Sequence, residues 1–514
     1  MSTSSLSPST HARRYTLYAA LSLLALLIHG YHPFASDGGL YAAGIRHVLD
    51  PSLYHFNAPF VTAFTHHSIF AILIGALVRL THLPLAWALL LAHLVSLWLF
   101  LCAAHALAAR VFAGESARWF AVLLAAACCA LPVAGTALVL MDPYLTARSF
   151  STPLSLFAVA ACLDRKGLGT VLLLTAAVLF HPLMGAYAIG FVLVLALIRS
   201  GRSRSAVLLS CAGLIAAGIV FAATHNAPVS PGYREALLLP QRTFLFLARW
   251  HWYELLGIVL PLLLFAAATQ KFPSSTPTGA LCRTAIAIGT TSFLIAALFV
   301  PPSGPYLLVP LQVLRSCHLI YLVGVVLCGG VLSSLAARSH VAAAGVLLLL
   351  AAIMFQVERV SWPGCNRIER PGLAPSNPCE QAFLWIRRHT PSDATFAFNP
   401  QFAYRPGEDE QNFRALAERD ALADDKDAGV VAILPSLAGP WAMQRNTELF
   451  VDSMTDAERY TALAPLGVTW LLLPPDAPTS FPCPFSNLAV KVCQLEPPPA
   501  PRPHPKANGP GHIA

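Results

Sequence analysis

Apolar residues dominate the chain in long runs, separated by short segments that carry most of the polar side chains. A helix needs roughly 20 apolar residues to cross a bilayer, and fewer when other helices surround it. By this criterion the pattern predicts an α-helical polytopic membrane protein with about eleven transmembrane helices. The predicted spans are residues 15–31, 83–108, 119–140, 150–163, 168–181, 184–198, 206–224, 252–269, 284–300, 313–336 and 341–357.

The basic residues between these runs predict how the spans are oriented. Arg13 and Arg14 precede the first run, which places residues 1–14 in the cytoplasm as a short tail. A cleaved signal peptide would begin in the same way, but no A-x-A motif follows and further apolar runs do, which favours an uncleaved anchor. The short run 69–80 is interpreted as a helix lying at the outer interface, because a crossing there would place the later basic clusters outside.

This orientation places every loop rich in polar residues on the non-cytoplasmic side. The transmembrane domain covers residues 15–357 and includes a large first outer loop, 31–82. From residue 358 to 496, helical and strand-like patterns alternate, which predicts a small extracytoplasmic α/β domain. Its predicted helices are 381–389, 412–429 and 455–465, and its predicted strands are 395–400, 430–434 and 468–475. Residues 497–514 are rich in proline and poor in apolar side chains, so they are predicted to be disordered.

Composition supports the membrane class. Hydrophobic residues make up 56% of the 514 residues, charged residues only 11%, and the mean hydropathy is +0.62. Soluble proteins contain roughly 25% charged residues, so the chain as a whole departs strongly from a soluble protein and the lipid bilayer is its expected surrounding. The net charge of +8 comes from short basic clusters between apolar runs rather than from one basic surface. Topology explains this charge, and no nucleic-acid partner is expected.

Four of the twelve cysteines lie in the polar C-terminal part. An even number there fits an oxidising compartment, where disulfide bonds form. Of the three ways to pair them, the short-loop pairing is favoured: Cys365 with Cys379, and Cys483 with Cys493.

Two acidic residues in the outer loops are candidate catalytic groups. Asp37 follows the first span, and a carboxylate shielded from water there should be a better base than one in solution. Asp is also a preferred N-cap residue, so Asp37 could instead cap the helix that follows. Asp142 is followed six residues later by Arg148, whose guanidinium can bind a phosphate with two hydrogen bonds. A plain Asp142–Arg148 salt bridge would use the same two residues without any chemistry.

Further candidates lie at the predicted outer ends of spans. His181 interrupts an apolar run, and Arg315 and His318 lie one helical turn apart at the start of the tenth predicted span. Ionisable side chains at membrane depth are candidates for function, although side chains near a span end can also reach the interface without any role. His47, His55, His66, His67 and Asp37 could supply metal ligands, but the first loop contains no HExxH, CxxC or D-x-D motif, so no zinc site is predicted.

The order of these features resembles the membrane glycosyltransferases of the GT-C superfold, which include protein mannosyltransferases and the bacterial aminoarabinose transferase. The resemblance rests on one span, a long outer loop that begins with an acid, an interfacial helix, and a second acidic loop after two further spans. Asp37 matches the first-loop acid taken as the catalytic base, Asp142 matches the second acidic position, and Arg315 in LVPLQVLRSCH is similar to a late-span arginine near the lipid phosphate. The chain departs from that pattern where Gly38 and Gly39, rather than a second acid, follow Asp37.

The resemblance implies an enzyme of the plasma membrane that transfers a sugar from a polyprenyl-phosphate carrier to an acceptor at the outer face. Asp37 would take the acceptor's proton, and Asp142 would orient the acceptor or a divalent cation. Arg148, His181, Arg315 and His318 would bind the substrate or the lipid phosphate. The alternative is a non-catalytic or transporter-type protein that handles lipid-linked glycans. A transporter would be expected to have broken helices and polar groups at the bilayer midplane.

Overall fold

A computed structural model describes residues 8–200, 212–213, 216, 220, 224, 229–304, 306–405 and 409–497. The described chain is mostly helical, with a small sheet near its C-terminus. Its helices up to the end of the apolar region are α1 (Pro8–His29), α2 (Ser36–Leu49), α3 (Ala58–Thr62), α4 (Phe70–Thr81), α5 (Leu85–Val111), α6 (Glu115–Ala127), α7 (Ala147–Leu163), α8 (Gly167–Phe180), α9 (Pro182–Arg199), α11 (Pro231–Leu238), η1 (Pro240–Leu245), η2 (Leu247–Arg249), α12 (Trp252–Lys271), α13 (Pro277–Phe299), η3 (Val309–Leu311), η4 (Val313–Ser316), α14 (Cys317–Arg338) and α15 (His340–Ser361).

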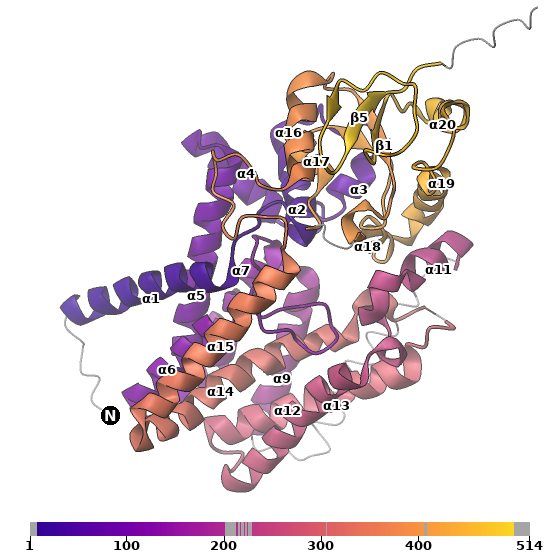
Figure 1. The fold of residues 1–514 in the computed structure, drawn as a ribbon. Helices are drawn as coiled ribbons and strands as arrows, with labels where there is room; N and C mark the ends of the chain where they lie inside the picture. The colour runs from indigo at the N-terminus through magenta and orange to yellow at the C-terminus, as the bar shows by residue number, and fades with distance from the viewer. Residues whose placement is uncertain are drawn as a thin grey trace, which may run out of the picture.

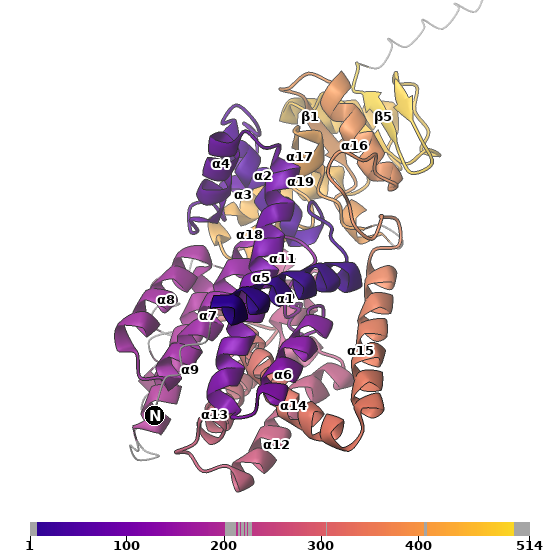
Figure 2. The same ribbon diagram turned by 90° about the vertical axis from the view of Figure 1, so that its left-hand side faces the viewer.

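The C-terminal part contains shorter elements. They are α16 (Pro378–His389), β1 (Thr395–Phe398), η5 (Phe402–Tyr404), α17 (Phe413–Ala417), β2 (Asp420–Ala421), α18 (Ala428–Val431), η6 (Pro435–Leu437), α19 (Ala438–Glu448), α20 (Asp456–Leu463), η7 (Ala464–Leu466), β3 (Trp470–Leu473), β4 (Phe485–Ser486) and β5 (Lys491–Gln494). Figures 1 and 2 show this part at one end of the helical bundle, with α2, α3 and α4 next to it.

Six helical segments in the described residues are long and apolar enough to cross a membrane. They are 85–111, 182–199, 252–271, 277–299, 309–338 and 340–361. In the windows of 252–271 and 340–361 only 11% of the residues are buried within the protein, so their apolar side chains point outward as they would toward lipid. The prediction of a helical membrane protein is therefore confirmed.

The prediction of about eleven spans is wrong for the described residues, which contain six. The predicted span 119–140 contains only the later part of the 13-residue helix α6, because the chain turns after Ala127 and continues through Pro132. Helices α7 and α8 have 17 and 14 residues, fewer than the roughly 20 needed to cross a bilayer alone. Helix α1 has 22 residues but begins with polar ones, and it runs across the direction of α15 in both views (Figures 1 and 2). The predicted span 206–224 and the tail 498–514 lie mostly or wholly outside the described residues.

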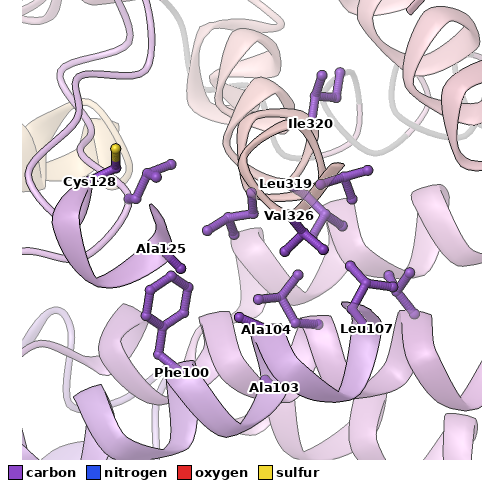
Figure 3. Packing of buried hydrophobic residues seen from close by; sticks show 14 of the residues in the cluster. Phe100, Ala103, Ala104, Leu107, Ala125, Cys128, Leu319, Ile320 and Val326 are labelled. Carbon is purple, nitrogen blue, oxygen red and sulfur yellow. The ribbon is translucent and has the colours of Figure 1, made fainter. Parts of the chain in front are cut away.

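The core of the bundle is a tight contact among α5, α6 and α14. Phe100 and Leu107 of α5 pack toward Ala125 of α6 and Val326 of α14 (Figure 3). Helix α14 approaches α6 so closely that a Cβ on Gly329 would lie 2.5 Å from the Cα of Ala121. Small residues at such contacts let helix backbones approach closely. Helices in lipid associate through close packing of this kind, because the hydrophobic effect does not drive them together there.

The C-terminal sheet has five strands in the order β2-β1-β3-β5-β4. Strand β1 pairs in parallel with β2 and β3, with Phe396 opposite Ala421 and Trp470, whereas β5 runs antiparallel to β3 and β4. The predicted strands at 395–400 and 468–475 and the helices at 381–389 and 455–465 are present. The predicted strand 430–434 is instead helix α18 and the turn after it, and the predicted helix 412–429 breaks at Glu418, which has a φ of +51°.

Helices α2 and α4 of the first loop share one hydrophobic core with the C-terminal part. Ala42 and Ile45 of α2 and Phe70 of α4 belong to the same buried cluster as Phe383 of α16 and Phe396 of β1. The first loop and the C-terminal part therefore form one packed unit, which fixes the start of α2.

Candidate functional site

Asp37 lies in the first turn of α2, not at its N-cap, which is Ala35. The alternative that Asp37 caps this helix is therefore wrong, although a carboxylate in a first turn still gains from the helix dipole. The glycines that follow allow close packing at this end. A Cβ on Gly38 would lie 2.8 Å from Cβ of Tyr144, and a Cβ on Gly39 would lie 2.2 Å from Cβ of Asn412.

A lysine from the C-terminal part pairs with Asp37. The Nζ atom of Lys426 lies 3.5 Å from Oδ1 of Asp37 and 3.3 Å from a carboxylate oxygen of Glu410. It also donates to Oγ of Ser36, at 2.8 Å. The Asp37 side chain is still 38% exposed, so it faces a space open to solvent even though its pKa is strongly affected by burial.

Four cationic side chains from separate segments act on Asp37. Burial alone would raise the pKa of Asp37, but Lys426, Arg148, Arg315 and Arg242 together lower it to about 2. Asp37 is therefore ionised at neutral pH and is a weaker base than an isolated Asp. The expectation that shielding makes it a better base is wrong for this state of the protein, because the nearby cations outweigh desolvation.

Two of these cations have no carboxylate partner among the described residues. Arg242 is 7% exposed and donates to the carbonyl oxygen of Lys426 at 3.0 Å, whereas its Nε atom has no hydrogen-bond partner. The Nε atom of Arg315 is likewise unpartnered. The two guanidinium carbons lie 5.9 Å and 5.2 Å from the centre of the Phe244 ring, so both arginines stand against one aromatic side chain.

Asp142 forms a buried salt bridge with Arg148. Arg148 Nη2 lies 2.8 Å from Oδ1 and 2.7 Å from Oδ2, and its Nε lies 3.1 Å from Oδ2. This is the plain ion pair that the sequence left open as an alternative. It occupies both carboxylate oxygens of Asp142 and fixes the guanidinium of Arg148, which interacts electrostatically with Asp37 and Tyr41.

The two predicted histidines bind the protein's own backbone. His181 is the N-cap of α9, and its Nδ1 accepts from the Met184 amide at 3.4 Å. The Nε2 atom of His318 lies 3.1 Å from the Leu140 carbonyl oxygen. His318 and Arg315 also line a small pocket between α7, α9 and α14, together with Thr152 and Tyr187. Asp37, Asp142 and His181 do not line this pocket, although Asp37 and Arg315 both act electrostatically on His181.

Electrostatic interactions connect Asp37 with Arg148, Arg315 and His181, and Asp142 pairs with Arg148. The structure also adds residues that the sequence did not reveal. Arg242 lies in PQRTFLFL, where an arginine in an apolar stretch was a weak signal. Lys426 lies in DDKD, within the predicted helix 412–429, and nothing in that pattern singled it out. The acidic residues beside Lys426 form ion pairs with arginines instead: Asp425 binds Arg445 and Asp427 binds Arg414.

One of the two predicted disulfide bonds is present and the other is not. Cys483 and Cys493 form the predicted disulfide bond, across ten residues of sequence. Cys365 and Cys379 are not joined, so that pairing is wrong. Cys379 is buried in the core of α16, whereas Cys365 receives a hydrogen bond from Nε2 of Gln411 at 3.2 Å.

The region around Asp37 thus combines an ionised carboxylate with an excess of cationic side chains, in a space that solvent reaches. Such a region can bind a phosphate and keep a carboxylate next to it. Comparison with models of protein families and with curated proteins finds no match for this chain.

Proposed function

We propose that the protein is an integral membrane glycosyltransferase that moves a sugar from a polyprenyl-phosphate carrier to an acceptor at the non-cytoplasmic face of the plasma membrane. One observation carries this proposal. Four cations act electrostatically on Asp37, and Arg242 and Arg315 among them have no carboxylate partner in the described part of the chain. A phosphate is the ligand that such a charge excess favours.

The membrane setting narrows the class of phosphate ligand. In the described part of the chain six helices are long and apolar enough to span a bilayer, and a polyprenyl chain needs the same apolar surroundings. When the bond between sugar and phosphate breaks, negative charge grows on the phosphate. Arg315 and Arg242 already stand against the Phe244 ring in the free protein, so they would stabilise that charge with little reorganisation.

In this proposal Asp37 accepts the proton of the acceptor's hydroxyl group. Its low pKa in the free protein comes from the same cations that would bind the phosphate. A bound phosphate adds negative charge close to Asp37 and offsets those cations, so it raises the pKa of Asp37 and makes it a stronger base. Asp142 acts as a positioning residue, because its carboxylate fixes the guanidinium of Arg148.

The orientation is part of the proposal. Arg13 and Arg14 at the start of α1 would keep the N-terminus in the cytoplasm, and the first loop and the C-terminal part would lie together outside. The site would then open to the outer leaflet, where lipid-linked sugars meet extracytoplasmic acceptors.

Binding of a polyprenyl phosphate to the full-length protein in nanodiscs tests the proposal, with the matching polyprenol as the uncharged comparison. We expect Arg315→Gln and Arg242→Gln each to weaken binding of the phosphate by about 10- to 100-fold, because a hydrogen bond to a charged group contributes about 1.5–3 kcal/mol. Arg249→Gln is the matched control, since that guanidinium donates to the Leu238 and Leu239 carbonyl oxygens and is not among the cations that act on Asp37. Asp37→Asn should strengthen binding of the phosphate, because it removes a nearby negative charge, and should abolish sugar transfer.

Equal affinity for the polyprenol and the polyprenyl phosphate would contradict the proposal, and so would unchanged binding in both arginine variants. Carrier binding that depends on the arginines, without any transfer by the wild-type protein, would instead favour a non-catalytic protein that handles lipid-linked glycans.

A further inference from the structure

A second cluster of reactive side chains lies where α1 leads into the first loop and α15 leads into the C-terminal part. His32, Cys365 and Glu369 each offer one ligand atom, and these three atoms lie within 4.8 Å of one another. The two backbone segments are already joined here. The Tyr31 amide donates to the Arg367 carbonyl oxygen at 2.9 Å, and the Glu369 amide donates to the Tyr31 carbonyl oxygen at 3.0 Å.

His32 is held as metal-binding histidines usually are. Its Nδ1 faces Glu369, at 2.8 Å, and its Nε2 lies 3.1 Å from a carboxylate oxygen of Glu358. Glu358 is buried and pairs in turn with Arg367. Trp362 stacks on the imidazole, with 4.8 Å between ring centres. A carboxylate on the second ring nitrogen is the usual outer partner of a histidine ligand, and it fixes which nitrogen is free to bind.

Two buried oxygen atoms in the cluster lack partners. Oε2 of Glu369 has no hydrogen bond, although its side chain is only 9% exposed. Oε1 of Gln411, which is 3% exposed, has none either. The amide nitrogen of Gln411 lies 3.2 Å from Sγ of Cys365 and 3.1 Å from Oε1 of Glu369. Amide oxygen and nitrogen exchange places by a half-turn of the side chain, which would bring Oε1 to the cluster.

The local charge is negative. Glu358, Glu369, Glu380 and Asp409 are all buried or nearly buried, and Glu369 and Asp409 both act electrostatically on Glu380. Arg367 is the cation that pairs with this group among the described residues. Buried carboxylates in excess are costly unless a cation compensates them.

We propose that His32, Cys365 and Glu369 bind a zinc ion, with the fourth position next to Gln411. Sulfur, imidazole nitrogen and carboxylate oxygen form a ligand set that suits Zn²⁺ and not Mg²⁺ or Ca²⁺. The ion would take the place of the proton between His32 and Glu369, and of the thiol proton of Cys365. It would fasten the first loop, five residues before Asp37, to the segment after α15. The inference is independent of the sugar-transfer proposal.

The test uses the full-length protein, purified through a tag without histidine, stripped with a chelator and titrated with Zn²⁺ and with Co²⁺. We expect one zinc ion per chain, a higher unfolding temperature with zinc, and a thiolate-to-cobalt charge-transfer band. Cys365→Ser and His32→Asn should each weaken zinc binding by at least about 100-fold, more than the loss of an outer partner would cause. Cys328→Ser is the control, because that cysteine lies exposed on α14.

The variant Cys365→Asp distinguishes the loss of a zinc ligand from the loss of the fold. This variant should fold, keep a weaker site and lose the charge-transfer band, because an oxygen ligand replaces sulfur. The proposal is overturned if the wild-type protein takes up no stoichiometric zinc or cobalt, or if the charge-transfer band persists in Cys365→Ser or Cys365→Asp.

Discussion

At the scale of single residues, opposing electrostatic effects decide the state of Asp37. Desolvation favours the neutral acid, whereas Lys426, Arg148, Arg315 and Arg242 favour the carboxylate, and the cations prevail. The result is an ionised group in a region of excess positive charge. Its basicity would therefore depend on what anion occupies the region.

Gly39 is the residue that permits this arrangement, and Gly39→Ala should disrupt it. A Cβ there would lie 2.2 Å from Asn412 Cβ and 2.3 Å from the Phe34 carbonyl oxygen, so the C-terminal part must shift. We expect a loss of about 1–3 kcal/mol of stability, measured by thermal unfolding in detergent, because overpacked sites cost that much.

The matched control for Gly39→Ala is Gly439→Ala in α19, where a Cβ would meet no atom within 4 Å. That change should be neutral or stabilise by up to about 1 kcal/mol, because alanine favours a helix more than glycine does. Equal unfolding temperatures for the two variants would contradict the packing argument.

At the scale of elements, α19 holds three distant segments together through buried polar side chains. Gln444 binds Asn57 of the first loop, and Arg445 binds both Asp425 and Glu235 of α11. Trp441 donates to the Asp424 carbonyl oxygen at 2.8 Å. These contacts place the 424–427 segment, and so they bring Lys426 to Asp37.

The last residue of α19, Glu448, should make stability depend on pH. Burial raises the pKa of Glu448 well above its usual range, and Asp424 and Asp427 add to that effect. The folded protein then holds a proton that the unfolded chain releases above about pH 4.3. Stability contributed by this group is therefore present at low pH and is lost as the pH rises toward the raised pKa.

We expect the unfolding temperature of the wild-type protein, measured relative to that of Glu448→Gln, to fall between about pH 5 and pH 8. Asp424, whose pKa burial raises to about 7, contributes to the slope in both proteins and does not enter this difference. Asp393→Asn, at an exposed residue, is the control and should leave the slope unchanged. An identical slope in Glu448→Gln would show that Glu448 is ionised in the folded state.

At the scale of the whole molecule, the first loop and the C-terminal part share one core, so both lie on the same side of the membrane. Labelling with a membrane-impermeant maleimide identifies that side. We expect Leu488→Cys, at a residue that is 93% exposed, to react in intact cells. Gly114→Cys, in the exposed turn between α5 and α6, should react only after lysis. The reverse pattern would invert the protein and remove the proposed site from the outer face.

Several features followed from the sequence because they depend on nearby residues. Long apolar runs predicted a helical membrane protein, and helices of sufficient length are present. Strands β1 and β3 and helices α16 and α20 lie where local patterns placed them. The bond between Cys483 and Cys493 closes a short loop, so its partners were close in sequence as well as in space.

Other features were decided only by the tertiary structure. The number of membrane-length helices depends on where the chain turns, as it does after Ala127. The side chain of Cys365 lies close to His32, which is more than 300 residues earlier in the chain. Arg242 and Lys426 join Asp37 because a first loop, a middle loop and a C-terminal segment pack together. The hydropathy of a segment indicates whether its surroundings are apolar. Contacts between residues distant in sequence arise from the packing of the whole chain, so no local sequence pattern predicts them.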